Sequence, residues 1–119
     1  MLFAAPASIA DAVISAKDAK VTKESFGELL LYFQGSTDQL KSMTAGSLRL
    51  KPGASPHPPH DHPEEEFLLV TEGTGEITVA GKMTKVGPGS MMYCAAGKTH
   101  GIVNTGNAPL LFYFYKWAR

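Results

Sequence analysis

The 119-residue sequence contains one cysteine, no long apolar run and no excess of charge of either sign. A single cysteine, Cys94, cannot form an intrachain disulfide or supply a cysteine-rich zinc module. The longest uninterrupted apolar runs are only a few residues, well short of the ~20 that a membrane-spanning helix needs. Eleven Lys and Arg residues balance eleven Asp and Glu residues, so the chain lacks the basic surplus that holds a phosphate backbone. Binding to nucleic acid and insertion into a membrane are therefore not expected.

The composition is that of a folded protein, with 44% hydrophobic and 18% charged residues. Its length suits one domain. Twelve glycines and eight prolines punctuate short apolar segments, a pattern typical of many short strands joined by tight turns. We expect residues 21–119 to form one barrel domain and residues 1–20 to form an N-terminal extension.

Eight segments have the hydrophobic pattern of β-strands, and they are separated by turn residues rather than by long helical stretches. They are residues 28–34, 42–51, 66–72, 76–80, 82–86, 90–94, 100–104 and 109–117. The second of these changes its alternation near Gly46, which predicts a register change there. Because no helical crossover of useful length lies between the strands, a parallel α/β sheet is not favoured. The sequence predicts an all-β sandwich or barrel.

The N-terminal extension differs in composition from the rest of the chain, because it is rich in alanine. Residues 8–17 place Ile9, Val13 and Ala16 at helical spacing, which predicts a short helix. An Ala-Pro-Ala triplet near the start resembles an export cleavage site, but no positive residue precedes it and the apolar stretch is short. We expect a cytoplasmic protein, or a periplasmic or secreted one if residues 1–10 are the remnant of a longer signal.

The four histidines fall in two places in the sequence. Three lie in the proline-rich tract 51–63 and one lies farther on: His57, His60, His62 and His100. On an extended segment, His60, His62 and Glu66 share one face. A helix beginning at Pro63 is the alternative, but the β-rich residues 67–71 and the glycines after them favour a strand.

Any one of these histidines alone is more simply explained as a solvated loop residue. Three imidazoles and a carboxylate on strands that can face each other form a nitrogen and oxygen ligand set. Such a set suits Mn, Fe, Ni, Cu or Zn, and it contains too much nitrogen for Ca or Mg. The combination favours a metal site.

Two groups of residues carry a resemblance to the small single-domain members of the cupin superfamily. The first motif of that family is represented by Gly53, His60, His62, Glu66 and Gly73, and the second by Gly89, Gly97, His100 and Asn104. Gly53 stands one residue farther from His60 than is usual, and Ala95 replaces a proline of the second motif. Neither departure touches a proposed ligand.

The resemblance implies a double-stranded β-helix, which is a jelly-roll barrel of six to eight strands. It also implies that one divalent transition metal is bound by His60, His62, Glu66 and His100. Asn104 would be a structural residue near the site. Cupins usually form homodimers.

The function expected from these residues is that of a mononuclear metal-dependent enzyme acting on a small polar molecule. A dioxygenase-like reaction and a sugar isomerase-like or epimerase-like reaction are both open. A barrel that binds a metal or small ligand without turnover is the alternative, and a purely structural metal ranks last. The cavity walls would come from some of these residues: Met43, Arg49, Met91, Met92, Tyr93, Phe112 and Phe114.

Three further residues have two interpretations each. Arg49 is either a clamp for a substrate carboxylate or an exposed strand residue. His57 is either a base at the mouth of the barrel or a loop residue. Cys94 is either a buried inert thiol or a nucleophile, and no paired histidine and acid is evident for the second role.

The last predicted strand carries two sets of aromatic side chains, Phe112 and Phe114 on one face and Tyr113, Tyr115 and Trp117 on the other. One face must lie inside the barrel. The other must be covered, either by Ile9 and Val13 of the extension or by a second subunit, because three large aromatics in water would be an unusual patch. We therefore expect a homodimer.

Overall fold

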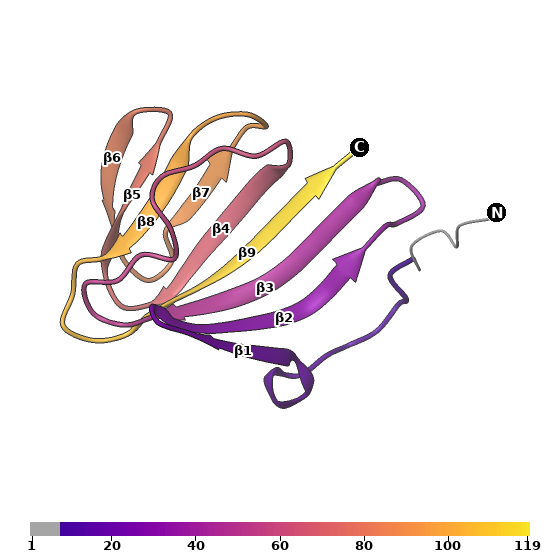
Figure 1. Cartoon of the computed structure of the whole chain (residues 1–119), viewed down its shortest axis with the longest axis horizontal. Helices are drawn as coiled ribbons and strands as arrows, with labels where there is room; N and C mark the ends of the chain where they lie inside the picture. Colours follow the sequence, from indigo (N-terminus) through magenta and orange to yellow (C-terminus); the bar gives the residue numbers. More distant parts are fainter. Residues whose placement is uncertain (1–7) are drawn as a thin grey trace.

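The computed structural model describes residues 8–119, and their regular secondary structure is nearly all strand. A 3-10 turn, η1 (Ala16–Asp18), is followed by β1 (Lys20–Glu24), β2 (Gly27–Gly35), β3 (Ser42–Leu50), β4 (Glu65–Glu72), β5 (Gly75–Val79), β6 (Lys82–Val86), β7 (Met91–Cys94), β8 (His100–Asn104) and β9 (Leu110–Ala118). The strands form a six-stranded sheet in the order β1-β2-β3-β9-β4-β7 and a three-stranded sheet in the order β6-β5-β8 (Figure 1). The strand pairs are antiparallel, and the predicted all-β jelly-roll barrel is confirmed.

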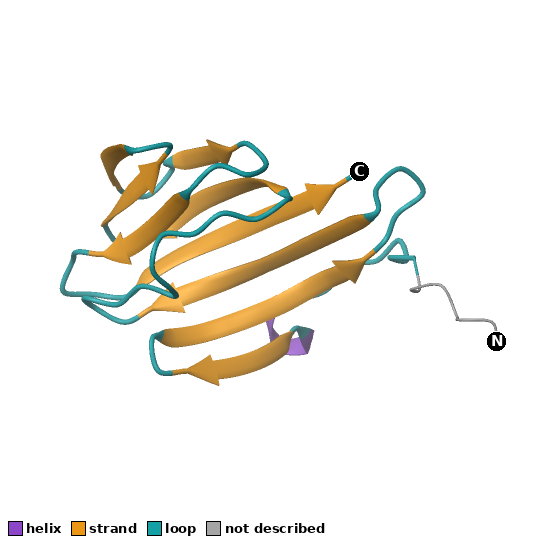
Figure 2. Cartoon of the chain, turned by 45° about the horizontal axis from the view of Figure 1, so that its top comes forward, coloured by secondary structure: helices purple, strands orange, loops and turns teal. Residues whose placement is uncertain are grey.

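The hydrophobic core lies between the two sheets. Strand β4 shows the cause, because Leu68 and Val70 alternate with side chains that point out of the barrel. The buried cluster comprises Leu50, Leu68, Val70, Ile77, Met92, Cys94, Ile102, Leu110 and Phe112. These residues come from both sheets and fill one end of the sandwich. The large sheet extends beyond the small one, as Figure 2 shows.

The register change expected near Gly46 is present, but it lies in the neighbouring strand. Strand β3 pairs with β9 without interruption, whereas β2 carries a bulge between Leu31 and Phe33, opposite Gly46. A Cβ on Gly46 would lie 2.6 Å from the Leu30 carbonyl oxygen and 2.8 Å from the Phe114 ring. Gly46 thus lets β2 and the Phe114 ring approach the backbone of β3 closely.

The predicted helix over residues 8–17 is wrong. Only the three-residue turn Ala16–Asp18 is helical, and Val13 is 99% exposed. With Val13 unpacked, a helix here would bury too little apolar surface to offset the cost of starting it. No helix in residues 8–119 has the length and apolar character needed to cross a membrane. The interpretation of residues 1–10 as an export remnant falls mostly on residues 1–7, which lie outside the described residues.

The outer face of the six-stranded sheet is aromatic. Phe67 on β4 lies 5.3 Å from Tyr93 and 5.8 Å from Trp117, measured between ring centroids. Phe67, Met91, Tyr93 and Tyr115 are exposed, and Val13 does not cover them. Val13 therefore does not cover this face, whereas a cover by the half-buried Ile9 or by a second subunit stays a prediction.

Candidate metal centre

The four predicted ligands come from two segments that backbone hydrogen bonds hold together. His60 and His62 lie in the loop before β4, Glu66 is in β4, and His100 begins β8. The backbone N–H of His60 donates to the His100 carbonyl at 3.0 Å, and that of His100 donates to the His60 carbonyl at 2.8 Å. The N–H of Gly97 donates to the carbonyl of His62 at 2.9 Å. The proline-rich loop is therefore fixed against the start of β8 and the turn before it.

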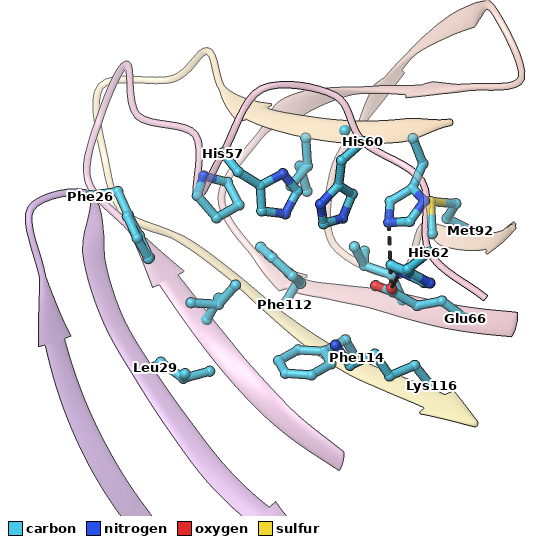
Figure 3. A pocket seen from close by; sticks show the side chains of 16 residues that line it. Phe26, Leu29, His57, His60, His62, Glu66, Met92, Phe112, Phe114 and Lys116 are labelled. Atoms are coloured by element: carbon cyan, nitrogen blue, oxygen red, sulfur yellow. Dashed lines mark hydrogen bonds and ion pairs between the residues drawn. The ribbon is translucent and has the colours of Figure 1, made fainter. Parts of the chain in front are cut away.

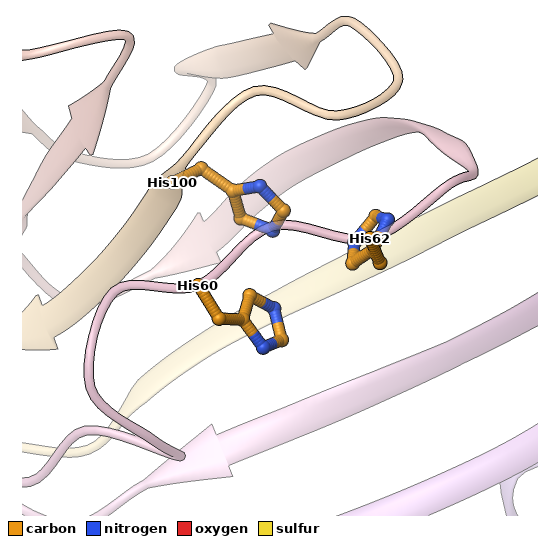
Figure 4. A group of neighbouring side chains, drawn as sticks. All are labelled: His60, His62 and His100. Carbon is orange, nitrogen blue, oxygen red and sulfur yellow. The ribbon is translucent and has the colours of Figure 1, made fainter.

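The three imidazoles converge on one point (Figure 4). One ring nitrogen from each of His60, His62 and His100 lies within 4.8 Å of the other two. Nitrogen ligands about 2.0–2.1 Å from a shared ion lie at most about 4.2 Å apart. The three nitrogens are therefore close to the spacing of ligands that share one metal ion, and they would move closer together on binding it.

The carboxylate of Glu66 lies beside two of these imidazoles. Its Oε1 lies 2.9 Å from His62 Nε2 and 3.4 Å from His100 Nε2, and the residue is 8% exposed. Burial on its own would raise the pKa of Glu66, but the hydrogen bonds and charges of His100 and His62 outweigh it and lower that pKa. The carboxylate is therefore ionised and faces the imidazoles.

The hydrogen bonds of His62 suit a metal ligand. Its Nδ1 lies 3.0 Å from the Glu64 carbonyl oxygen, and its Nε2 faces the Glu66 carboxylate. Both ring nitrogens thus face acceptors, although a neutral imidazole carries only one N–H. A cation at Nε2 resolves this conflict, because Nδ1–H then donates to the carbonyl and the Nε2 lone pair is free for the ion.

The other two imidazoles differ in their electrostatics. The hydrogen bond that His100 donates to Glu66 raises the pKa of His100, against the opposing effect of burial, and the Nδ1 of His100 is buried without a hydrogen-bond partner. Burial, followed by the repulsion of His57, His100 and His62, lowers the pKa of His60. A lowered pKa keeps the His60 imidazole neutral, which is the form that binds a metal.

A cavity of about 260 Å³ opens beside the histidines. The loop side carries His57, His60 and His62, and the facing wall is formed by β9 and β2 with Phe112, Phe114 and Leu29 (Figure 3). A metal held at the histidine end would therefore have one open side, towards the cavity. A small molecule in the cavity would have access to it.

Only some of the residues predicted to line this cavity do so. Met92, Phe112 and Phe114 line it. Met43, Arg49, Met91 and Tyr93 lie on the opposite face of the sheet, since they occupy the alternate positions of their strands.

Arg49 is therefore not a clamp for a substrate carboxylate. Its guanidinium pairs with Glu72 at 3.4 Å, and both side chains are about half exposed. The alternative, an exposed strand residue, is confirmed. Tyr93 likewise donates its hydroxyl proton to Glu65 on the outer face, at 2.7 Å.

His57, the fourth histidine, lines the mouth of the cavity. Its ring stacks on His60 with 3.6 Å between centroids, and its Nδ1 lies 2.8 Å from the Pro58 carbonyl oxygen. His57 is thus a loop residue, and its ring also forms part of the cavity wall.

Cys94 is buried, and its thiol lies 3.3 Å from the Lys98 carbonyl oxygen. Burial raises the pKa of Cys94, which favours the inert thiol over the nucleophile.

Asn104 has the structural role that was expected. It is fully buried, and its side-chain amide donates to the carbonyls of Leu50 and Ala108. Its Oδ1 accepts from the N–H of Gly106 at 2.9 Å. Asn104 thereby ties β8 to the end of β3 and to the loop before β9.

Sequence reasoning missed several residues that line the cavity, among them Phe26, Leu29 and Lys116. A signal for Lys116 was present, because it continues the alternation of Phe112 and Phe114 along β9. Phe26 and Leu29 gave no such signal, because the direction of their side chains depends on how the hairpin of β1 and β2 packs.

Several solved structures of barrel proteins share the fold of this chain. An RmlC-like cupin from Shewanella frigidimarina superposes with a TM-score of 0.76 at 14% identity, covering 95% of this chain and 96% of that one. A predicted oxalate decarboxylase from Thermotoga maritima gives 0.74 at 22%, covering 91% and 100%. A sugar phosphate isomerase of the cupin superfamily from Silicibacter pomeroyi gives 0.74 at 20%, covering 91% and 76%.

Comparison with curated proteins gave no significant match. The family model for the cupin domain matches residues 46–115, which include both histidine motifs and most of the barrel. The match covers more than half of the chain. The chain therefore belongs to the cupin domain family.

Proposed function

We propose that the protein binds one divalent transition metal through His60, His62, Glu66 and His100 and uses it to act on a small molecule in the adjacent cavity. The convergence of three imidazoles and one carboxylate at the end of an open cavity of about 260 Å³ carries this proposal. A site that only stabilised the fold would have no need of an open side.

The chemistry of the donor set supports a transition metal. Three neutral imidazoles and one carboxylate leave a charge of +1 on a divalent ion, and nitrogen-rich sets favour Mn, Fe, Ni, Cu or Zn over Ca and Mg. Bound at this position, the ion would supply Lewis acidity to an oxygen atom of the substrate. The residues of the chain would orient that substrate and shield it from water.

The reaction belongs to one of two classes, oxygenase-like chemistry or isomerisation. The structural neighbours named above as a predicted oxalate decarboxylase and a sugar phosphate isomerase share only the fold, because both are under 25% identical. The mainly apolar walls favour the first class, since they offer few partners for the hydroxyl groups of a sugar. Binding without turnover is the alternative that an activity screen must separate.

Elemental analysis tests the metal. The protein is purified without chelator and without a histidine tag, next to His100→Ala and the double variant His60→Ala/His62→Ala. We expect about one transition-metal ion per chain in the parent and none in the two variants. His57→Ala is the matched control, since it removes an imidazole from the same cavity without removing a ligand.

Circular dichroism shows whether the variants keep the β-fold. Retention of the metal in the folded double variant would refute the ligand assignment. With the metal confirmed, oxygen-consumption assays on aromatic carboxylates and isomerase assays on sugars distinguish the two reaction classes.

A further inference from the structure

One cationic side chain faces the cavity. Lys116 lies on β9, directly opposite Glu66 of β4 in the antiparallel register. Side chains of such a pair leave the sheet on the same face, with their Cβ atoms about 5 Å apart. Figure 3 shows Lys116 running along β9 beside Phe114, on the wall that faces the histidines.

Lys116 has no carboxylate partner in the described part of the chain. No ion pair within 4.0 Å joins it to Glu66, whose Oε1 is held by His62 and His100. Among the residues that line the cavity, Lys116 is the single lysine, and no arginine lines it. Its ammonium group is therefore available to a ligand.

The charges of the loaded site call for an anion. With a divalent ion, the carboxylate of Glu66 and the ammonium of Lys116, the cavity would carry a net charge of +2. A cavity with apolar walls solvates such charge poorly, so a negatively charged ligand gains more there than it would in water. Lys116 is the register partner of Glu66, whose Oε1 lies 2.9 Å from His62 Nε2, so Lys116 and the imidazoles border the same cavity.

The rest of the cavity is apolar. Its walls include Phe26, Leu29, Leu48, Phe112 and Phe114, and the other polar side chain outside the ligand set is His57. A sugar in this space would leave hydroxyl groups without hydrogen-bond partners, at a cost of about 1–3 kcal/mol for each buried group. A hydrocarbon or aryl body would fill the same space at no such cost.

We propose that Lys116 is the anion-binding residue of this cavity and that its ligand is a compact amphipathic carboxylate, with its charged end between Lys116 and the metal position and its apolar body against Phe26, Leu29 and Phe114. The metal contact rests on the proposed function, whereas the Lys116 contact and the apolar walls do not. The cavity volume of about 260 Å³ suits a small body, such as one aromatic ring with a short chain.

Calorimetric titration tests this proposal with probes of known structure. The carboxylates are benzoate, phenylacetate and 3-phenylpropanoate. The neutral match is 3-phenylpropanamide and the polar match is gluconate. Each probe is titrated into the zinc-loaded and the metal-free protein. We expect at least one aryl carboxylate to bind about tenfold more tightly than the amide, because a charged hydrogen bond to the ammonium is lost in the amide.

The variants assign the effect to Lys116. Lys116→Met should weaken the carboxylate at least tenfold and leave the amide unchanged, and Lys116→Arg should retain most of the carboxylate affinity. Lys116→Gln serves the same purpose if the Met variant does not fold. Lys85→Met, on the exposed strand β6, is the matched control and should behave as the parent does.

Three results would overturn the proposal. They are binding of none of the aryl carboxylates by the parent, unchanged carboxylate affinity in folded Lys116→Met, and tighter binding of gluconate than of the aryl carboxylates. The metal content of each sample is measured in parallel. If the parent holds no metal but the carboxylate preference still depends on Lys116, the proposed function fails and the role of Lys116 stands.

Discussion

Replacing Asn104 by alanine should destabilise the barrel by about 3 kcal/mol. The side chain makes three hydrogen bonds, two as a donor to the carbonyls of Leu50 and Ala108 and one as an acceptor from the N–H of Gly106. It is fully buried, so water cannot replace these partners. Each bond contributes about 1 kcal/mol, and a buried group left unpaired costs about 1–3 kcal/mol. The expected loss is a large share of the 5–15 kcal/mol that typically stabilises a domain.

Urea unfolding followed by circular dichroism measures this loss as a lower midpoint with an unchanged slope. Asn107→Ala is the matched control, because Asn107 is exposed in the loop after β8 and its removal should change the free energy of unfolding by less than about 0.5 kcal/mol. The folded fraction of Asn104→Ala should still bind metal, since Asn104 is not a ligand. A loss below 1 kcal/mol for Asn104→Ala would refute the reasoning.

Three further predictions follow from particular contacts. Gly73→Ala should destabilise the fold by more than 2 kcal/mol, because the φ of Gly73 is +82° and a Cβ there would lie 2.3 Å from the Pro109 carbonyl oxygen. Gly89→Ala is the control and should cost about 1 kcal/mol, because Gly89 has a φ of +89° but open space around it. Equal urea midpoints for the two variants would contradict this prediction. Metal affinity should fall as the pH falls, beginning above ~6.5, the ordinary pKa of an imidazole. The reason is that the neighbouring carboxylate raises the pKa of His100, and a proton on His100 competes with the ion. A metal dissociation constant that does not change between pH 8 and pH 5.5 would oppose this prediction. Light scattering should show a homodimer that Tyr115→Glu, on the exposed aromatic face, converts to monomer, and a monomeric parent at high micromolar concentration would rule the dimer out.

The strands could be predicted from the sequence because their hydrophobic alternation is regular and the turns carry glycine or proline. Strand β1 was not predicted, because its residues Lys20–Glu24 are almost all exposed and show no alternation of apolar side chains. It forms only by pairing with β2 at the edge of the large sheet, which is a tertiary contact. The predicted helix failed because helical spacing alone was not enough: Val13 packs against nothing, and the backbone at Ile9 bonds instead to Ser36.

The four residues of the candidate site could be proposed because their spacing is local in two motifs, and the structure brings them together. Which side chains of each strand point into the barrel could not be predicted, because each bulge reverses which side chains point inward. Arg49 was weighed as an inward cation and points outward, whereas Lys116 was overlooked and points inward. Two residues of the same charge type on paired strands thus have opposite roles, and only the register distinguishes them.

Anomalous X-ray scattering from crystals of the metal-loaded protein tests the central claim most directly. Data collected on both sides of the absorption edge of the metal should show one strong peak per chain. The peak should lie about 2.0–2.3 Å from a ring nitrogen of His60, His62 and His100 and from an oxygen of Glu66. A peak held by other residues, or none in crystals whose solution gave one metal per chain, would contradict the assignment of this cavity as a metal centre.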